Sequence, residues 1–443
     1  MEGCSDFRIK ELVNSICRLL LGEENEFNED PSILKINNEN LSEYGDVCFL
    51  TNLDTWKKVF RNSFTPTTSC GNILEHYLIR NEIKFEDCDA VEKAFQNIVQ
   101  ASSNWSLKIE TCQLRNERVS VFLNRTQTFA NGLARIVVRD HSYGQLTPKC
   151  GSFFFHIVKD LDSDLTNLRL RLIKGVAENI VKANGYQVSE GSDSDRYYVT
   201  TKSKRDLTKY PKILLCGVTK NSVTGTKETA LTEAEYLRRK LAELADTTEH
   251  RLSDLAEPKH EQNSVLSQIA EAVIALQFLA VKPSRTLTIS SELGLDETTI
   301  NVKGSSFILY NTARISAIFQ KFDQQYLKGD YPSLPSIEEV DFSLLREAEE
   351  WELMHIFLLG YPEMVKSCAR LTGDLEVCPH YICSFLSRLA SKFSAYYRRV
   401  RVLTEGRDHL LPTMMARLYL LKAIQIVTRN ALSLLNLDPV SRM

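Results

Sequence analysis

The sequence predicts a multidomain α+β protein, with an N-terminal α+β domain at residues 1–150, a reduced α/β region at 151–300 and an all-α bundle at 301–443. Three observations predict this fold class. The 443 residues are 43% hydrophobic, which is enough for two to four domains with cores of their own. Helical and strand-like patterns are mixed up to about residue 300. From residue 301 the pattern is helical almost throughout.

Composition narrows the class of protein further. The net charge of −3 is nearly balanced, and the N-terminus has neither a basic leader nor a small-residue cleavage site. No run of 18 apolar residues occurs, so we expect no membrane span. Eleven cysteines, an odd number without C-x-x-C spacing, indicate reduced thiols and a cytoplasmic location.

The segment "CPHYIC", in which His380 lies between Cys378 and Cys383, is the most tempting group of potential metal ligands. A zinc site needs four ligands in paired short spacings, and the neighbouring sequence does not supply them. Core cysteines are the favoured interpretation. We expect no metal and no cofactor.

The first 150 residues mix two patterns. The segments "RIKELVNSICRLLL" and "CDAVEKAFQNIVQ" have helical periodicity. Polar and apolar residues alternate in "WSLKIETCQL" and "RVSVFLNR", as they do in half-buried strands. An α+β domain is predicted.

The central region contains one clear helix-to-strand unit. The segment "LTNLRLRLIKGVAENIVKANGYQVSEG" predicts a long helix that ends at Gly185, a standard C′ residue, and a short strand after it. Residues 190–210 are polar, charged and poor in aliphatic side chains. We expect them to form a loop or the edge of a reduced domain.

The C-terminal third predicts a helical bundle interrupted by an extended crossing at Pro332 and Pro335. Its last helix carries an apolar stripe that must face other helices, formed by Leu420, Ile424, Val427, Ala431 and Leu434. Asn436 stands where the helix needs a left-handed residue at C′, and Pro439 prevents the helix from resuming. The chain is expected to turn back over its own bundle.

Basic residues are concentrated in this bundle. Nine Lys or Arg residues and two acidic residues lie between Arg388 and Arg429. Aromatic residues stand among them, and cationic surfaces with aromatic rings suit single-stranded RNA. A solvated basic face over core aromatics is the equally weighted alternative. The residues that the RNA interpretation assigns to binding are Tyr396, Tyr397, Arg398, Arg399, Arg401, Lys422 and Arg429.

Several separated segments resemble arginyl-tRNA synthetases. "SSFILYNTARISAIFQKF" is similar to the segment that opens their anticodon-binding domain, and "LASKFSAYYRRVRVL" and the terminal "LDPVSRM" are similar to later parts of it. That all-helical module is called the DALR domain. The resemblance implies an anticodon site lined by Tyr310, Arg314 and Tyr397, with Arg442 on a phosphate and Met443 on a base. Phe307 and Lys321 lie on the same predicted helix as Tyr310 and Arg314, and they are assigned to the same RNA-binding site.

The resemblance also extends to the synthetase's nucleotide site, where the sequence departs from it. The four positions of the H-x-G-H signature are Asp164, Leu165, Thr166 and Asn167, so neither histidine remains to contact a triphosphate. Of the second, lysine-bearing signature only Lys227 survives as a candidate. G-x-G-x-x-G, G-x-x-x-x-G-K-[ST], G-x-S-x-G and H-E-x-x-H are absent from the sequence. We expect no catalytic residues and no enzymatic activity.

The whole pattern resembles the family of DALR anticodon-binding domain-containing proteins. The resemblance implies a non-catalytic protein that recognises arginine tRNAs for a methyltransferase forming 3-methylcytidine. Residues 1–150 would then bind the tRNA body or a partner. Two alternatives remain open: an active arginyl-tRNA ligase, and an interaction scaffold that has lost RNA binding.

Overall fold

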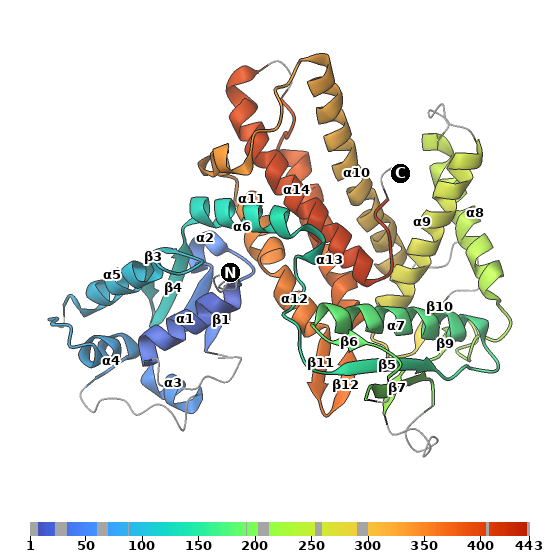
Figure 1. Ribbon diagram of the computed structural model, residues 1–443, viewed down its shortest axis with the longest axis horizontal. Helices are drawn as coiled ribbons and strands as arrows, with labels where there is room; N and C mark the ends of the chain where they lie inside the picture. Colours follow the sequence, from blue (N-terminus) through green and yellow to red (C-terminus); the bar gives the residue numbers. More distant parts are fainter. Residues whose placement is uncertain are drawn as a thin grey trace. The chain divides into compact units, whose positions relative to one another are not determined.

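The computed structural model describes residues 8–22, 33–59, 70–86, 88–191, 193–202, 212–252, 259–289, 300–404 and 407–440 (Figure 1). The chain forms two compact units, and neither is continuous in sequence. Unit 1 consists of residues 1–138, 334–360 and 404–423. Unit 2 consists of residues 139–333, 361–403 and 424–443. The three-part division at residues 150 and 300 stays a prediction.

Unit 1 is built on a four-stranded antiparallel sheet in the order β1-β2-β4-β3. Its strands are β1 (Leu34–Ile36), β2 (Val47–Leu50), β3 (Ile109–Arg115) and β4 (Arg118–Leu123). Val119, Val121 and Leu123 of β4 are buried, as the alternating pattern predicts. The helices are α1 (Ile9–Leu21), α2 (Leu41–Tyr44), α3 (Leu53–Val59), α4 (Ile73–Arg80), α5 (Ala90–Ser102) and α6 (Arg125–Arg139). The predicted mixture of helices and strands in the N-terminal part is confirmed.

A segment from the C-terminal third completes the core of unit 1. It contains 3₁₀ turns at Ile337–Glu339 and Phe342–Leu344, α11 (Ala348–Glu352) and a π-helical stretch, Leu353–Leu358. The buried indole of Trp351 donates a hydrogen bond of 2.7 Å to the carboxylate of Asp46. His355 Nε2 lies 3.1 Å from the carbonyl oxygen of Asn37. These contacts join residues that are about 300 positions apart in sequence.

Unit 2 contains a four-stranded parallel sheet in the order β6-β5-β7-β8. The strands are β5 (Ser152–Ile157), β6 (Gln187–Val188), β7 (Asp195–Thr200) and β8 (Ile213–Leu215), and α7 (Asp164–Ala183) connects β5 to β6. Gly185 follows α7 with a φ of 89°, as predicted for its C′ position. The expectation of a loop or edge at 190–210 is wrong for β7, which lies between β5 and β8 and buries Tyr197 and Val199.

A second part of unit 2 packs against α7. It consists of α8 (Glu233–Leu252), α9 (Lys259–Leu279) and a parallel strand pair, β9 (Thr219–Asn221) and β10 (Leu287–Ile289). The fully buried guanidinium of Arg169 joins these elements through hydrogen bonds to carbonyl oxygens. The acceptors are Gly217, Val281, Lys282 and Arg285.

The C-terminal third is helical, with a small hairpin that the sequence pattern does not predict. Its helices are α10 (Ile300–Lys328), α12 (Tyr361–Ser367), α13 (Pro379–Arg399) and α14 (Leu411–Leu434), and the hairpin pairs β11 (Ala369–Thr372) with β12 (Asp374–Val377). The predicted stripe of α14 is buried at Leu420, Ile424, Val427 and Ala431. Asn436 has a φ of 58°, which confirms the predicted left-handed helix stop.

The helix that ends at Leu434 is long and apolar enough to cross a membrane by length and composition. However, 61% of its apolar window is buried inside the protein, as in the core helix of a globular domain. The ten cysteines in the described part of the chain are all free thiols, and seven of them are buried. Reduced, mostly buried thiols agree with the prediction.

Candidate nucleic-acid interface

Two helices of unit 2 bring a guanidinium between two tyrosine rings. Tyr310 and Arg314 lie one turn apart on α10, and Tyr397 lies in the last turn of α13, which packs against α10. The guanidinium carbon of Arg314 is 4.5 Å from the ring centroid of Tyr310 and 4.9 Å from that of Tyr397. We call these three residues the Tyr-Arg-Tyr cluster.

Hydrogen bonds fix the guanidinium in this position. Arg314 donates to the hydroxyl oxygen of Tyr310 at 2.8 Å and to the side-chain oxygen of Asn311 at 3.3 Å. Tyr397 is 37% exposed, and Tyr310 and Arg314 are half-buried. An exposed ring beside a planar cation offers a surface on which an unstacked base can stack. The remaining guanidinium donors suit a phosphate oxygen.

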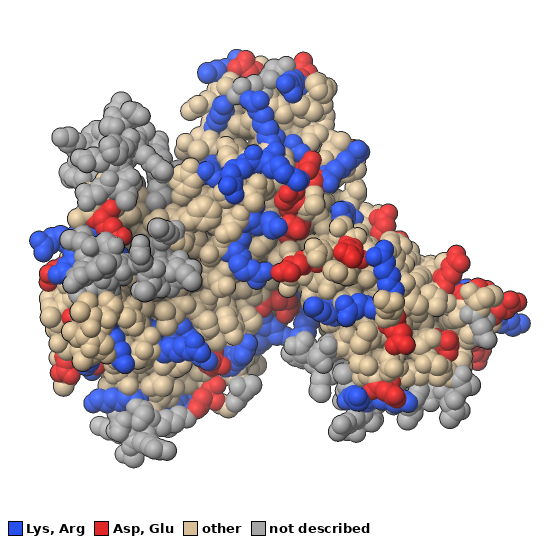
Figure 2. Space-filling model, turned by 180° about the vertical axis from the view of Figure 1, so that it is seen from behind, with Lys and Arg blue, Asp and Glu red and all other residues tan. Residues whose placement is uncertain are grey.

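Other residues assigned from the sequence lie on the same two helices. Phe307 is half-buried on α10, and Lys321 is exposed further along it. Arg398 and Arg399 are exposed in the last turn of α13, where cations are favoured by the helix dipole, and Arg401 is exposed just beyond it. On the face drawn in Figure 2, several Lys and Arg side chains gather near the top of the view.

Two assigned residues, Tyr396 and Arg429, differ from the expectation of an unpaired RNA-facing side chain. The ring of Tyr396 is fully buried, because helical periodicity places it with Phe393 on the core face of α13. That correction removes Tyr396 from the interface. Arg429 on α14 forms an ion pair of 2.5 Å with Asp140. Lys422 is exposed on the part of α14 that belongs to unit 1. Arg442 and Met443 lie outside the described residues.

The N-terminus of α7 is closed by its own side chains at the positions of the degenerate nucleotide signature. The hydroxyl of Ser163 accepts a hydrogen bond from the backbone N–H of Thr166. The Thr166 hydroxyl lies 2.8 Å from that of Thr219 on β9. Leu165 is fully buried in an apolar cluster with Phe278. These contacts use the Thr166 N–H and hydroxyl at a helix end of the kind that can bind anions.

Lys227, the surviving candidate lysine of the second signature, is held by two carboxylates. Its ammonium lies 2.6 Å from Asp160 and 3.2 Å from Asp162. Burial opposes ionisation of Asp160, but the hydrogen bond from Lys227 keeps the pKa of this carboxyl below its ordinary value. The same pairing keeps the pKa of Lys227 above its ordinary value, although burial acts in the opposite direction. The ammonium of Lys227 is thus already paired with two carboxylates.

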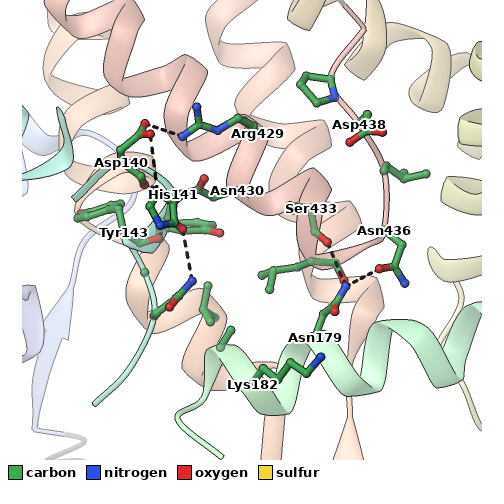
Figure 3. Close-up of a pocket in the computed structure, with 18 residues that line it drawn as sticks. Asp140, His141, Tyr143, Asn179, Lys182, Arg429, Asn430, Ser433, Asn436 and Asp438 are labelled. Carbon is green, nitrogen blue, oxygen red and sulfur yellow. Dashed lines mark hydrogen bonds and ion pairs between the residues drawn. The ribbon is translucent and has the colours of Figure 1, made fainter. Parts of the chain in front are cut away.

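An open cavity of about 670 Å³ lies elsewhere in unit 2 and was not singled out by the sequence patterns (Figure 3). Its walls come from the loop after α6, the last turns of α7 and α14, the segment 436–439, and Tyr361 and Val365 of α12. The sequence signals closest to it were the helix stop at Asn436 and Pro439. Within the described residues, no group of three or more His, Cys, Asp or Glu is arranged to hold a metal.

Comparisons with known proteins agree with this geometry. Residues 308–443 match the family model of the DALR anticodon binding domain. DALR anticodon-binding domain-containing protein 3 of Mus musculus is 32% identical over 240 residues, which are 52% of this chain and 43% of that protein. The Danio rerio protein of the same name is 27% identical over 238 residues, which are 52% of this chain and 42% of that protein. The chain therefore spans less than half the length of these curated relatives.

Arginine–tRNA ligases are similar over a shorter part of the sequence, and their solved structures share the fold. The ligase of Geobacter metallireducens is 30% identical over 180 residues, covering 40% of this chain and 29% of the ligase. The arginyl-tRNA synthetase of Thermus thermophilus has a TM-score of 0.63 at 11% identity, with 98% of this chain and 100% of that chain covered. The Plasmodium falciparum enzyme has a TM-score of 0.58 at 10% identity, with 98% of each chain covered. The chain has an arginyl-tRNA synthetase-like fold.

Proposed function

Because residues 308–443 form a DALR anticodon binding domain, we propose that this protein is a non-catalytic tRNA-binding protein that recognises the anticodon stem-loop of arginine tRNAs. The observation that carries the proposal is the Tyr-Arg-Tyr cluster, which the anticodon binding domain presents half-exposed on α10 and α13. Exposed arginines at the end of α13 supply charge for the phosphate backbone.

The absence of catalysis is part of the proposal. Asp164, Leu165, Thr166 and Asn167 replace the H-x-G-H signature. Leu165 is buried in the apolar cluster, and the side chains of Thr166 and Asn167 form hydrogen bonds with Thr219 and Asp160. The pairing of Lys227 with Asp160 and Asp162 supports the same conclusion. Purified protein should neither bind ATP nor charge tRNA with arginine. Arginylation above the level of a no-protein control, with a known arginyl-tRNA synthetase as the positive control, would contradict this.

We further propose that the bound tRNA is presented to a methyltransferase that forms 3-methylcytidine in the anticodon loop, and that this occurs in the cytoplasm. The support is the resemblance described from the sequence, together with the free thiols of the ten described cysteines. Residues 1–150 would contact the tRNA body or the methyltransferase. Methylation of arginine tRNA by the purified enzyme, with and without this protein, tests the partnership.

The binding proposal is tested by titrating the full-length protein with an arginine tRNA and with a non-cognate tRNA. The Tyr397→Ala variant removes the exposed ring of the cluster and should lower affinity for arginine tRNA by about 1 to 3 kcal/mol, the usual contribution of one stacked base. Tyr381→Ala is a matched control, because Tyr381 lies at the opposite end of α13. Equal affinity of the native protein for both tRNAs would refute arginine specificity. Undetectable binding would favour the scaffold alternative.

A further inference from the structure

The open cavity of unit 2 has a defined polar lining (Figure 3). Asn179 and Lys182 come from α7, Asp140 and His141 from the loop after α6, and Arg429, Asn430 and Ser433 from α14. The segment after the helix stop contributes Asn436 and Asp438. Figure 3 shows Lys182 and Asn179 along one side of the cavity, with Asp140 and Arg429 on the other. The volume lies within the range of about 300 to 1,000 Å³ that is usual for small-molecule sites.

The helices α7 and α14 end at this cavity, but backbone carbonyl groups at their C-termini already accept hydrogen bonds. The carbonyl oxygen of Ala183 accepts from the N–H of Leu146, and that of Lys182 accepts from the N–H of Gly185. The side-chain amide of Asn179 donates to the carbonyl oxygens of Ser433 and Leu434. Helix C-termini normally favour cations through such orphan carbonyl groups. Here the charged side chains decide which ligand the cavity favours.

One basic and one acidic side chain of the lining pair with each other. The guanidinium of Arg429 lies 2.5 Å from Asp140, and its hydrogen bond holds the pKa of that carboxyl below the ordinary value. The Asn430 amide donates to the backbone carbonyls of Asp140 and Tyr143, which fixes the loop that carries this pair. Lys182 and Asp438 are both exposed, and among the described residues neither side chain has an ion-pair partner. These two groups are therefore open to a ligand.

We propose that the cavity holds one nucleotide of the bound RNA, with its phosphate on Lys182 and an amino group of its base on Asp438. The inference rests on the proposed tRNA binding and extends it to a second site. RNA is the source because Arg429, Asn430, Ser433 and the segment 436–439 belong to the anticodon binding domain, which therefore supplies part of the cavity wall. Unstacked loop nucleotides can swing out and enter a site of this kind, and a carboxylate accepts from exocyclic amino groups.

The test compares variants of the full-length protein in tRNA titrations at several salt concentrations. Lys182→Ala should lower the affinity for arginine tRNA roughly threefold to tenfold at low salt. It should also make the slope of log affinity against log salt concentration less negative by up to about 0.7, since one phosphate contact is lost. Ser433→Trp fills the cavity while keeping every charge, and should also weaken binding. Lys174→Ala is the matched control, because Lys174 lies on the same helix, pairs with Glu178 at 2.6 Å and does not line the cavity. It should bind like the native protein.

Two further experiments distinguish RNA from free mononucleotides and inorganic phosphate as the ligand. Ultraviolet cross-linking of the complex, followed by mass spectrometry, should place a nucleotide adduct on peptides containing residues 141–145 or 433–438. Mononucleotides and inorganic phosphate should not compete at millimolar concentration. Their binding to the RNA-free protein in a manner that depends on Lys182 would overturn RNA as the source.

The outcomes also separate this inference from the proposed function. If the native protein binds no tRNA, both fail together. If Tyr397→Ala weakens binding while Lys182→Ala and Ser433→Trp match the native protein in affinity and slope, with unchanged circular dichroism, only the cavity inference fails.

Discussion

Arg314 illustrates how single residues prepare the interface before any RNA is present. Its guanidinium is held between two rings and by the Tyr310 hydroxyl, so its plane is fixed in the free protein. A fixed group loses little conformational entropy on binding. The sequence could place Tyr310 and Arg314 on one helical face, but Tyr397 joins them only through the packing of α13 on α10. The neighbouring Tyr396 could be distinguished from Tyr397 only once the buried face of α13 was known.

The geometry predicts that charge alone is not sufficient at position 314. Arg314→Lys keeps the cation but loses the planar group that lies between the rings, so arginine tRNA affinity should fall by about 1 to 2 kcal/mol, close to the loss in Arg314→Ala. Filter binding of the three proteins measures this. Lys328→Ala, in the last turn of the same helix, is the control for general loss of charge. Native affinity in Arg314→Lys would show that the stacking arrangement is irrelevant.

A second residue, His355, makes unit 1 sensitive to pH. It is buried in the π-helical stretch, and burial lowers its pKa, although the nearby carboxylate of Asp46 acts in the opposite direction and Arg125 in the same one. Burial therefore favours the neutral ring in the folded state. The unfolded state binds the proton more readily than the folded state does. The contribution of His355 to the free energy of unfolding is therefore fully present above its unfolded pKa of about 6.5, and it is lost as pH falls through its lower folded-state pKa.

The expected result is a larger loss of unfolding free energy between pH 7.5 and pH 5 in the native protein than in His355→Gln. Urea unfolding at both pH values measures the difference. His76 and His380 also have lowered pKa values because of burial and contribute the same trend to both proteins. For that reason the comparison, and not the absolute pH dependence, is decisive. Identical pH dependence in the two proteins would exclude the role of His355.

At the scale of elements, the sequence predicts where helices end and which helix faces are buried, but it does not predict which strands pair. Gly185 and Asn436 could be assigned from the sequence because a helix stop requires a left-handed residue at a fixed position. The stripe of α14 followed from helical periodicity. β7 and the β11–β12 hairpin could not be predicted, because short strands depend on neighbours that are distant in sequence.

The role of Asn436 as a helix stop can be tested by substitution. Asn436→Gly keeps the backbone conformation and loses only the hydrogen bond that Asn179 donates at 2.6 Å, so it should cost about 0.5 to 1.5 kcal/mol of unfolding free energy. Asn436→Val also forces a β-branched residue into a positive φ and should cost about 1 to 3 kcal/mol more. Urea unfolding ranks the three proteins. Equal stability of the Gly and Val variants would show that the backbone conformation at this position is not constrained.

At the scale of the whole molecule, the anticodon binding domain is not one compact unit. Residues 334–360 and 404–423 lie inside its sequence limits but belong to unit 1. Trp351 and His355 from the first of these segments contact Asp46 and Asn37 of the N-terminal domain. The sequence suggested a boundary near residue 300 because the pattern changes there, and composition cannot report contacts made across such a boundary.

A fragment of residues 300–443 should therefore not fold as an independent domain. Without Asn37 and Asp46, the buried side chains of Trp351 and His355 lose their partners and face water. The fragment should retain helical circular dichroism but unfold without a cooperative transition in urea, in contrast to the full-length chain. A sharp transition in the fragment, together with native tRNA affinity, would contradict this prediction.

The discontinuous make-up of unit 1 also determines when it can fold during synthesis. Residues 1–138 are synthesised well before the last segment of unit 1, 404–423. At about 5 to 20 residues per second, the N-terminal part waits on the order of tens of seconds with its partner surface uncovered. Nascent chains stalled before residue 334 should be cleaved readily by protease and bind chaperones, whereas released full-length chains should resist cleavage.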